Sequence, residues 1–243
     1  MCGVTGFIDW NNSDSRDISA SVLTKMNNAL MHRGPDSSGI WFDASQKVFL
    51  GHTRLSILDL SEHGHQPMTS NSGRFCISFN GEIYNHQNIR KKIEKNNPSH
   101  QWKSESDTET ILESFNLFGV DQTLEIIEGM YAFCIFYKLE NKIFLIRDRV
   151  GEKPLYYSFQ NSVFLFGSEL KALIQSKVFN NKINIKSLDT FLKLKNVPSP
   201  NSVFENTWKL EPGKYLVLDL SSLNFHVKKY WSIEEVIKKQ KKS

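Results

Sequence analysis

The first nine residues of this 243-residue chain are Met1-Cys2-Gly3-Val4-Thr5-Gly6-Phe7-Ile8-Asp9. The short apolar run that starts at Gly3 predicts a β-strand almost at the N-terminus. Cys2 stands directly before this strand and would open it. The N-terminal stretch therefore combines a predicted strand with a reactive side chain at its start.

Short strands and helices follow along the chain. Apolar residues at four-residue spacing predict a helix over residues 18–30. Further strands are expected at 39–42, 47–52, 74–79, 131–137, 143–146, 155–158, 163–166, 215–220 and 225–230, and further helices at 87–95, 108–118, 169–175 and 185–194. Many short strands without regular strand–helix alternation indicate a layered α+β domain rather than a doubly wound sheet.

The composition is that of an ordinary globular protein, with 40% hydrophobic and 23% charged residues. The formal net charge is +4, and four lysines near the C-terminus supply it: Lys238, Lys239, Lys241 and Lys242. The rest of the chain is therefore neutral, which argues against a nucleic-acid-binding face. We expect the lysine-rich end to be solvated, with docking to a partner as the alternative.

Several features favour a cytoplasmic protein. The N-terminus lacks the apolar run of a secretory signal, and the apolar segment 130–137 is far shorter than the roughly 20 residues that span a bilayer. Cys2, Cys76 and Cys134 form no CxxC pair, which favours free thiols. Because no histidine stands in a ligand pattern with cysteine, no metal site is expected.

Cys2 is a candidate nucleophile by residue type. Removal of Met1 would leave a thiol and a free α-amine on one residue. The amine has an ordinary pKa of about 8, so it could accept the thiol proton without a histidine. The alternative is that Cys2 is only a small apolar residue at the start of a strand, and position alone favours this alternative.

Asn80 and Gly81 allow two interpretations. An isolated Asn-Gly pair favours a type I′ hairpin turn after the strand at 74–79, because both residues tolerate positive φ. An Asn amide beside a glycine N–H could also form a two-donor oxyanion hole, and a hairpin tip could serve both purposes. Arg54, Glu82 and Asp107 would by default be solvated charges, but beside a thiol nucleophile they could bind a zwitterionic amino acid.

These residues lie in segments that occur in the same order in class II glutamine amidotransferases. The segments are Met1-Cys2-Gly3-Val4-Thr5-Gly6, His32-Arg33-Gly34-Pro35-Asp36, Gly51-His52-Thr53-Arg54-Leu55-Ser56-Ile57, Phe79-Asn80-Gly81-Glu82-Ile83-Tyr84-Asn85, Ser106-Asp107-Thr108-Glu109, Gly129-Met130-Tyr131-Ala132-Phe133, Arg147-Asp148-Arg149-Val150-Gly151-Glu152-Lys153-Pro154-Leu155-Tyr156-Tyr157 and Phe166-Gly167-Ser168-Glu169-Leu170-Lys171-Ala172. From Cys2 to about Trp231, the chain resembles the glutaminase half of glutamine-dependent asparagine synthetase.

The resemblance implies an N-terminal-nucleophile hydrolase fold, a four-layer αββα sandwich of two antiparallel sheets between helical layers. It suggests a glutaminase domain over residues 1–210 and a C-terminal extension over 211–243. It also gives Cys2 the role of nucleophile and the freed Cys2 amine the role of base. The Asn80 amide and the Gly81 N–H would then hold the oxyanion.

The resemblance further implies a glutamine site. Arg54 would bind the α-carboxylate, and Glu82 and Asp107 would bind the α-amine. Leu55 and Ile57 match positions that line the glutamine pocket. Attack on the side-chain amide would release ammonia and leave a γ-glutamyl thioester, which water cleaves to glutamate.

The ammonia acceptor stays open. Members of the resembled family continue into an ATP-binding domain with a Ser-Gly-Gly-x-Asp-Ser loop, and this loop does not occur in the sequence. We therefore expect the glutaminase part of asparagine synthesis, either a truncated half-enzyme or a subunit with a separate synthetase chain. A glutaminase for another acceptor and an idle binding or remnant module are the alternatives. No cofactor is expected here, since ATP and magnesium would serve only the synthetase domain, and Cys76 and Cys134 are expected in the core.

Overall fold

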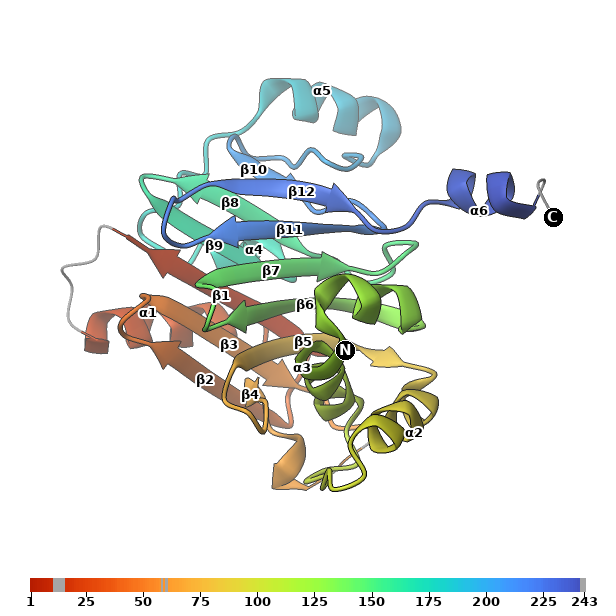
Figure 1. The fold of residues 1–243 in the computed structure, drawn as a ribbon. Helices are drawn as coiled ribbons and strands as arrows, with labels where there is room; N and C mark the ends of the chain where they lie inside the picture. Colours follow the sequence, from red (N-terminus) through yellow and green to blue (C-terminus); the bar gives the residue numbers. More distant parts are fainter. Residues whose placement is uncertain (11–15, 58, 60, 241–243) are drawn as a thin grey trace.

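The computed structural model describes residues 1–10, 16–57, 59 and 61–240. Its strands form two antiparallel six-stranded sheets (Figure 1). In spatial order, the first sheet contains β10 (Thr207–Lys209), β8 (Tyr156–Gln160), β9 (Val163–Gly167), β1 (Gly3–Asp9), β3 (Val48–Arg54) and β2 (Ser37–Asp43). The second contains β12 (Phe225–Lys229), β11 (Lys214–Asp219), β7 (Lys142–Arg147), β6 (Gly129–Tyr137), β5 (Phe75–Ile83) and β4 (Met68–Thr69).

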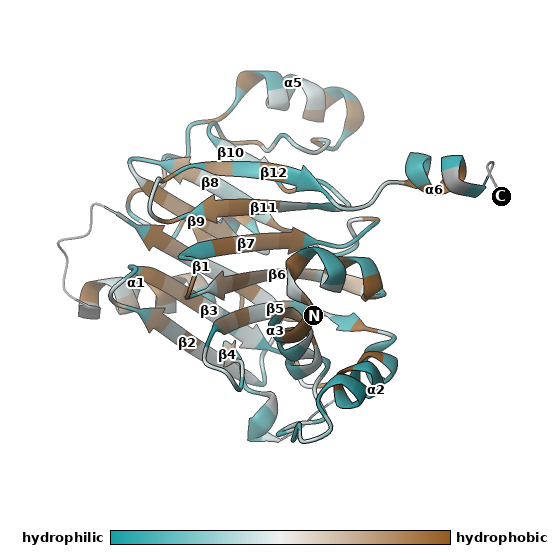
Figure 2. Ribbon diagram, viewed as in Figure 1, coloured by the Kyte–Doolittle hydropathy of each residue, from teal (hydrophilic) through white to brown (hydrophobic). Residues whose placement is uncertain are grey.

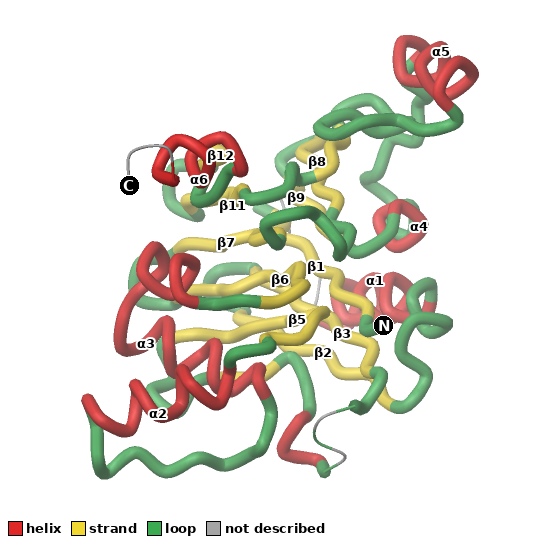
Figure 3. The backbone as a smooth tube through the Cα atoms, turned by 90° about the vertical axis from the view of Figure 1, so that its right-hand side faces the viewer, coloured by secondary structure: helices red, strands yellow, loops and turns green. Residues whose placement is uncertain are grey.

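Helices cover the outer face of each sheet. The first sheet is covered by α1 (Arg16–Asn28) and α4 (Leu170–Leu173), and the second by α2 (His86–Asn96) and α3 (Asp107–Ile126). A short 3₁₀ helix, η1, spans Glu62–Gly64. The helices α5 (Ile185–Leu194) and α6 (Ile233–Gln240) project from the body (Figure 1, Figure 3). No described helix is both long and apolar enough to cross a bilayer.

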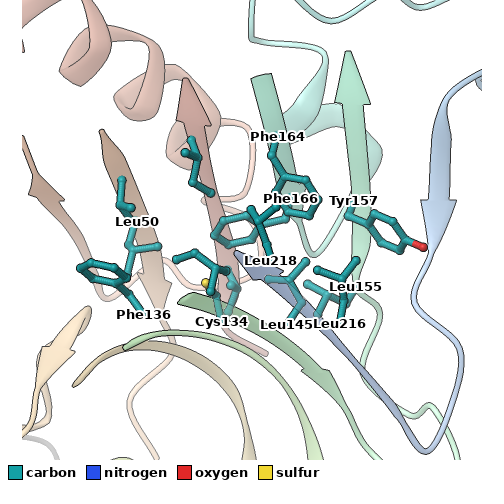
Figure 4. Packing of buried hydrophobic residues seen from close by; sticks show 14 of the residues in the cluster. Leu50, Cys134, Phe136, Leu145, Leu155, Tyr157, Phe164, Phe166, Leu216 and Leu218 are labelled. Atoms are coloured by element: carbon teal, nitrogen blue, oxygen red, sulfur yellow. The ribbon is translucent and has the colours of Figure 1, made fainter. Parts of the chain in front are cut away.

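Three clusters of buried hydrophobic side chains fill the spaces between the layers. The cluster between the sheets contains Cys76 and Cys134, as predicted for these cysteines (Figure 4). A second cluster, with Phe115, lies between the second sheet and its helices, and a third, with Met26, lies between the first sheet and α1. Figure 2 shows the corresponding apolar residues along the strands and a mostly hydrophilic α2. The order helix, sheet, sheet, helix confirms the predicted four-layer fold.

The predicted hairpin turn at Asn80-Gly81 is wrong. Both residues lie inside β5, opposite Ala132 and Tyr131 of β6, and neither has a positive φ. A Cβ atom at Gly81 would collide with the backbone carbonyl oxygen of Met130. The glycine therefore permits close approach of two strands and does not form a turn.

Other predicted elements occur close to the expected residues. Asn161 and Ser162 both have positive φ, 50° and 57°, at the turn that joins β8 to β9, which confirms the hairpin expected there. The strand pair β11 and β12 is also confirmed. The helix expected at 169–175 is reduced to α4, and β4, β10 and α6 were not predicted.

Residues 211–243, predicted as a C-terminal extension, contribute to the second sheet. Leu216 and Leu218 of β11 are fully buried in the cluster between the sheets. By contrast, Lys238 in α6 is exposed, while Lys241 and Lys242 lie outside the described residues. The division of function at residue 210 stays a prediction.

Candidate active site

Cys2, directly before β1 of the first sheet, and Asn80, in β5 of the second sheet, face the same gap. Val4 and Ile8 of β1, and Cys76 of β5, belong to the cluster between the sheets. Because side chains alternate along a strand, the even-numbered positions before Val4 and after Cys76 face the same interior. The Cys2 thiol and the Asn80 amide therefore both point into the space between the sheets, and both residues line one cavity.

This cavity has a volume of about 150 Å³. It is lined by all eight residues predicted for the site: Cys2, Arg54, Leu55, Ile57, Asn80, Gly81, Glu82 and Asp107. Met1, Gln66 and Lys153 also contribute to the wall. Residues from both sheets and from the start of α3 therefore meet here, although their individual roles stay predictions.

The Cys2 thiol is partly buried against the strand end of β3. The backbone N–H of Leu55 donates to Cys2 Sγ at 3.4 Å. Burial raises the pKa of the thiol, and this effect outweighs the Leu55 hydrogen bond and the nearby positive charge of Arg54, which lower it. The thiol is therefore protonated near neutral pH and needs a base before it can act as a nucleophile.

The edge of β5 that faces the cavity carries three backbone donors. The Phe79 N–H donates to Gln66 Oε1 at 2.7 Å, and the Ile83 N–H donates to Asp107 Oδ2 at 2.9 Å. Gly81 lies midway between Phe79 and Ile83. Since alternate N–H groups of a strand point to the same edge, the Gly81 N–H points to this edge as well. It is a backbone donor directed into the cavity.

The side-chain amide of Asn80 supplies a second donor. Asn80 is 1% exposed, and its Nδ2 has no hydrogen-bond partner among the described residues. Buried polar groups are nearly always paired, so an unpaired donor at a cavity wall indicates a ligand as its partner. Two donors on consecutive residues opposite a thiol can stabilise a negatively charged oxygen.

Asp107 is the first residue of α3 and is buried at the cavity wall. Burial raises its pKa to about 6, although the N–H groups of Ile83 and Thr108 lower it. Glu82 also lines the cavity and adds negative charge. The two carboxylates can bind an ammonium group. Within the described part of the chain, no three His, Cys, Asp or Glu side chains gather as a metal site.

Arg54 lies at the end of β3, where its guanidinium group lines the cavity. It donates one hydrogen bond to the Ser61 carbonyl oxygen at 2.9 Å and another to the Asp59 carbonyl oxygen. A guanidinium group has five N–H donors, so three have no partner among the residues that the structure describes. Leu55 is half-buried beside it, whereas Ile57 is 70% exposed.

Two residues that the sequence did not predict support the site. Gln66 donates from Nε2 to Thr108 Oγ1 at 3.2 Å and so connects α3 to the Phe79 backbone of β5. His52 is fully buried, and its Nε2 lies 2.9 Å from the Phe79 carbonyl oxygen. Burial lowers the pKa of His52 to about 3, so the ring is neutral and Nε2 donates. His52 lies in the motif at residues 51–57, but no local sequence pattern marks either His52 or Gln66 as a support of β5.

A thiol before the first strand of a sandwich of two antiparallel sheets between helices defines the class of N-terminal-nucleophile hydrolases. Two solved structures share the fold. A glutamine phosphoribosylpyrophosphate amidotransferase from Bacillus subtilis superposes with a TM-score of 0.67 at 17% identity, covering 95% of this chain and 49% of that chain. An allosteric regulatory enzyme of purine biosynthesis gives a TM-score of 0.68 at 16% identity, with the same coverage of 95% and 49%.

Sequence comparison then identifies the family. The glutamine amidotransferase domain family matches residues 1–231, and the chain belongs to this family. A putative glutamine-hydrolysing asparagine synthetase from Methanocaldococcus jannaschii is 37% identical over 253 residues, which cover 97% of this chain and 47% of the relative. A glutamine-hydrolysing asparagine synthetase from Bacillus subtilis is 32% identical over 237 residues, which cover 96% and 37%. The chain thus spans less than half the length of these relatives.

Proposed function

We propose that this chain hydrolyses the side-chain amide of glutamine to glutamate and ammonia, as the glutaminase half of glutamine-dependent asparagine synthesis. The observation that carries the proposal is the cavity lined by both the Cys2 thiol and the Asn80 amide, whose Nδ2 has no partner among the described residues. The names of the relatives support aspartate amidation as the use of the ammonia.

Glutamine binding uses the charges at the cavity wall. The three remaining donors of Arg54 bind the α-carboxylate of glutamine, and Glu82 and Asp107 accept hydrogen bonds from its α-ammonium group. Leu55 and Ile57 pack along the aliphatic part of the substrate. Held at this end, the substrate extends its side-chain amide toward Cys2.

The base in this proposal is the α-amine of Cys2. The raised pKa of the thiol requires a base, and none of the described residues that line the cavity is a histidine. Met1 is 55% exposed, so it is accessible for removal, which frees the amine. The amine then takes the thiol proton, and the sulfur attacks the amide carbon.

Attack moves the carbonyl electron pair onto oxygen, where the Asn80 amide and the Gly81 N–H bind the negative charge. The protonated amine returns its proton to the leaving nitrogen, so ammonia departs and a γ-glutamyl thioester remains. The amine next takes a proton from water, which attacks the thioester. The protonated amine returns its proton to the leaving sulfur, and the new γ-carboxyl group of glutamate releases its proton to solvent.

In this proposal ammonia passes in the cytoplasm to a synthetase part that holds ATP and magnesium, while the glutaminase step needs no cofactor. The synthetase part is a separate chain or the remainder of a longer protein. A glutaminase for another acceptor and an idle glutamine-binding module are the alternatives, because the residues of the cavity bind glutamine and do not determine the acceptor.

The test uses protein whose mass shows that Met1 is absent. We expect it to release glutamate from glutamine, whereas Cys2→Ala abolishes release and protein that retains Met1 is inactive. Cys134→Ala is the matched control, since this buried thiol lies outside the cavity and its loss affects stability more than turnover. Full turnover by Cys2→Ala would overturn the mechanism. Glutamine binding without hydrolysis would favour the binding module.

A further inference from the structure

Cys2 lies before the first residue of β1 and needs contacts other than the sheet to fix its position. Strand pairing begins with Gly3 opposite Thr53. Chain ends fray unless other groups hold them. The Leu55 N–H holds the sulfur, and Arg33 Nε donates to the Cys2 carbonyl oxygen at 3.0 Å. Arg33 is thus the side chain that fixes the backbone of the nucleophile.

Arg33 is in turn held by Glu169. Arg33 is only 8% exposed, and its Nη1 donates to Glu169 Oε1 at 2.8 Å. His32 Nε2 lies 3.0 Å from Oε1 of Glu169, and Lys171 Nζ lies 3.2 Å from Oε2. Partial burial alone would raise the pKa of Glu169, but the hydrogen bonds from Arg33, His32 and Lys171 lower it to about 2. Glu169 therefore keeps its charge at neutral pH.

Ser168, the residue before Glu169, also holds the start of β1 by hydrogen bonds. Ser168 is fully buried, its Oγ accepts from the Val4 N–H at 3.0 Å, and its own N–H donates to the Val4 carbonyl oxygen at 2.8 Å. Ser168 and Glu169 follow β9 directly. This short segment therefore holds the N-terminus at two points, Val4 directly and Cys2 by way of Arg33.

We infer that Glu169 is a positioning residue for Cys2, which acts by fixing the Arg33 guanidinium group that holds the Cys2 carbonyl. The inference rests on the proposed function, in which Cys2 is nucleophile and base. Arginine has a long, flexible side chain, so loss of the carboxylate frees Arg33 to adopt other rotamers. Since thiol and amine share one residue, a rotation of that residue misplaces both, and an error near 1 Å can cost about 100-fold in rate.

The kinetic test compares Glu169→Gln with Glu205→Gln. Glu205 pairs with Lys182 on the surface at 3.1 Å and lies outside the site, so its variant should behave as wild type. We expect Glu169→Gln to lower kcat for glutamine hydrolysis by about 10- to 100-fold, with KM within about twofold of wild type. Arg33→Gln should cause a similar loss. The double variant should lose no more than Arg33→Gln alone, because Glu169 acts through Arg33.

Hydrogen–deuterium exchange of the N-terminal peptide gives a readout that does not depend on turnover. Glu169→Gln and Arg33→Gln should speed exchange at Gly3 and Val4, while Glu205→Gln should not. Unchanged exchange and kcat in Glu169→Gln would overturn the inference, as would losses that add in the double variant. If wild-type protein releases no glutamate but Glu169→Gln still speeds exchange, the proposed function fails and the positioning contact stands.

Discussion

Asn80 keeps a buried side-chain N–H that no described residue accepts, and such a group costs stability. An unsatisfied buried donor typically costs about 1 to 3 kcal/mol. The chain therefore gains nothing structural from this N–H in the absence of a ligand. Its removal should therefore affect catalysis far more than stability.

The first prediction concerns Asn80→Ala. We expect kcat to fall by about 100- to 1000-fold, because one of two oxyanion donors is lost, while the melting temperature changes little. Ser78→Ala is the matched control two residues earlier on the same face of β5. Ser78 Oγ donates to the Gly51 carbonyl oxygen at 2.8 Å, so its loss should lower stability and leave kcat near wild type. A normal kcat in Asn80→Ala would show that the role of Asn80 is structural and not catalytic.

The second prediction concerns Asp107 and pH. Its pKa is about 6 in the folded chain and about 3.9 when unfolded, so the folded state binds more protons between these values. Stability should therefore fall as pH rises from about 4 to 6. At pH 7, Asp107→Asn removes a desolvated charge and should stabilise the fold by about 1 to 3 kcal/mol, while KM for glutamine rises.

Thermal unfolding between about pH 3 and 8 measures this effect. The advantage of Asp107→Asn over wild type should vanish below about pH 4. Asp43 gives a control of opposite sign, because hydrogen bonds from Ser45 and Gln46, with the charge of Lys138, lower its pKa despite partial burial. Asp43→Asn should destabilise the protein at pH 7. A destabilised Asp107→Asn at pH 7 would contradict the burial argument.

At the scale of elements, Gly81 matters both for the packing of β5 against β6 and for the candidate active site. The third prediction is that Gly81→Ala destabilises the pairing of β5 with β6, because the new methyl group meets the Met130 backbone and not a movable side chain. Overpacking of this kind costs about 1 to 3 kcal/mol or more. Gly167→Ala in β9 is the control, since its methyl group would lie 3.0 Å from the flexible end of Leu173. Equal melting temperatures for both variants would contradict this account.

Local sequence predicted elements better than it predicted their ends. The hairpin around Asn161 was predicted because two short, largely apolar segments, 155–158 and 163–166, flank this residue. The same reasoning failed at Asn80-Gly81, where pairing with β6 continues to Ile83 and overrides the local turn preference. All eight site residues that the motifs named line the cavity. The motifs could not name Gln66 as a link between β5 and α3, because that contact exists only after the chain has folded.

At the scale of the whole molecule, the C-terminal elements β11 and α6 differ in their contribution to the stability of the fold. The fourth prediction is that a chain ending at Ser232 keeps its melting temperature, because α6 is tied back mainly by the exposed pair of Lys229 and Glu235. A chain ending at Leu210 should not fold, because it lacks the buried strand β11. Circular dichroism and solubility measure both outcomes. A folded 1–210 chain would show that the sandwich does not need β11.

The short β4 has a consequence for how the protein avoids self-association. It pairs with β5 at Ile77 and Cys76, and no other strand of the described residues covers the rest of that sheet edge. An open edge invites a strand from another molecule. Here the Gln66 and Asp107 side chains occupy the N–H groups on either side of Gly81. A foreign strand would find one free donor instead of a continuous ladder, so this edge can admit a small carbonyl compound while resisting aggregation.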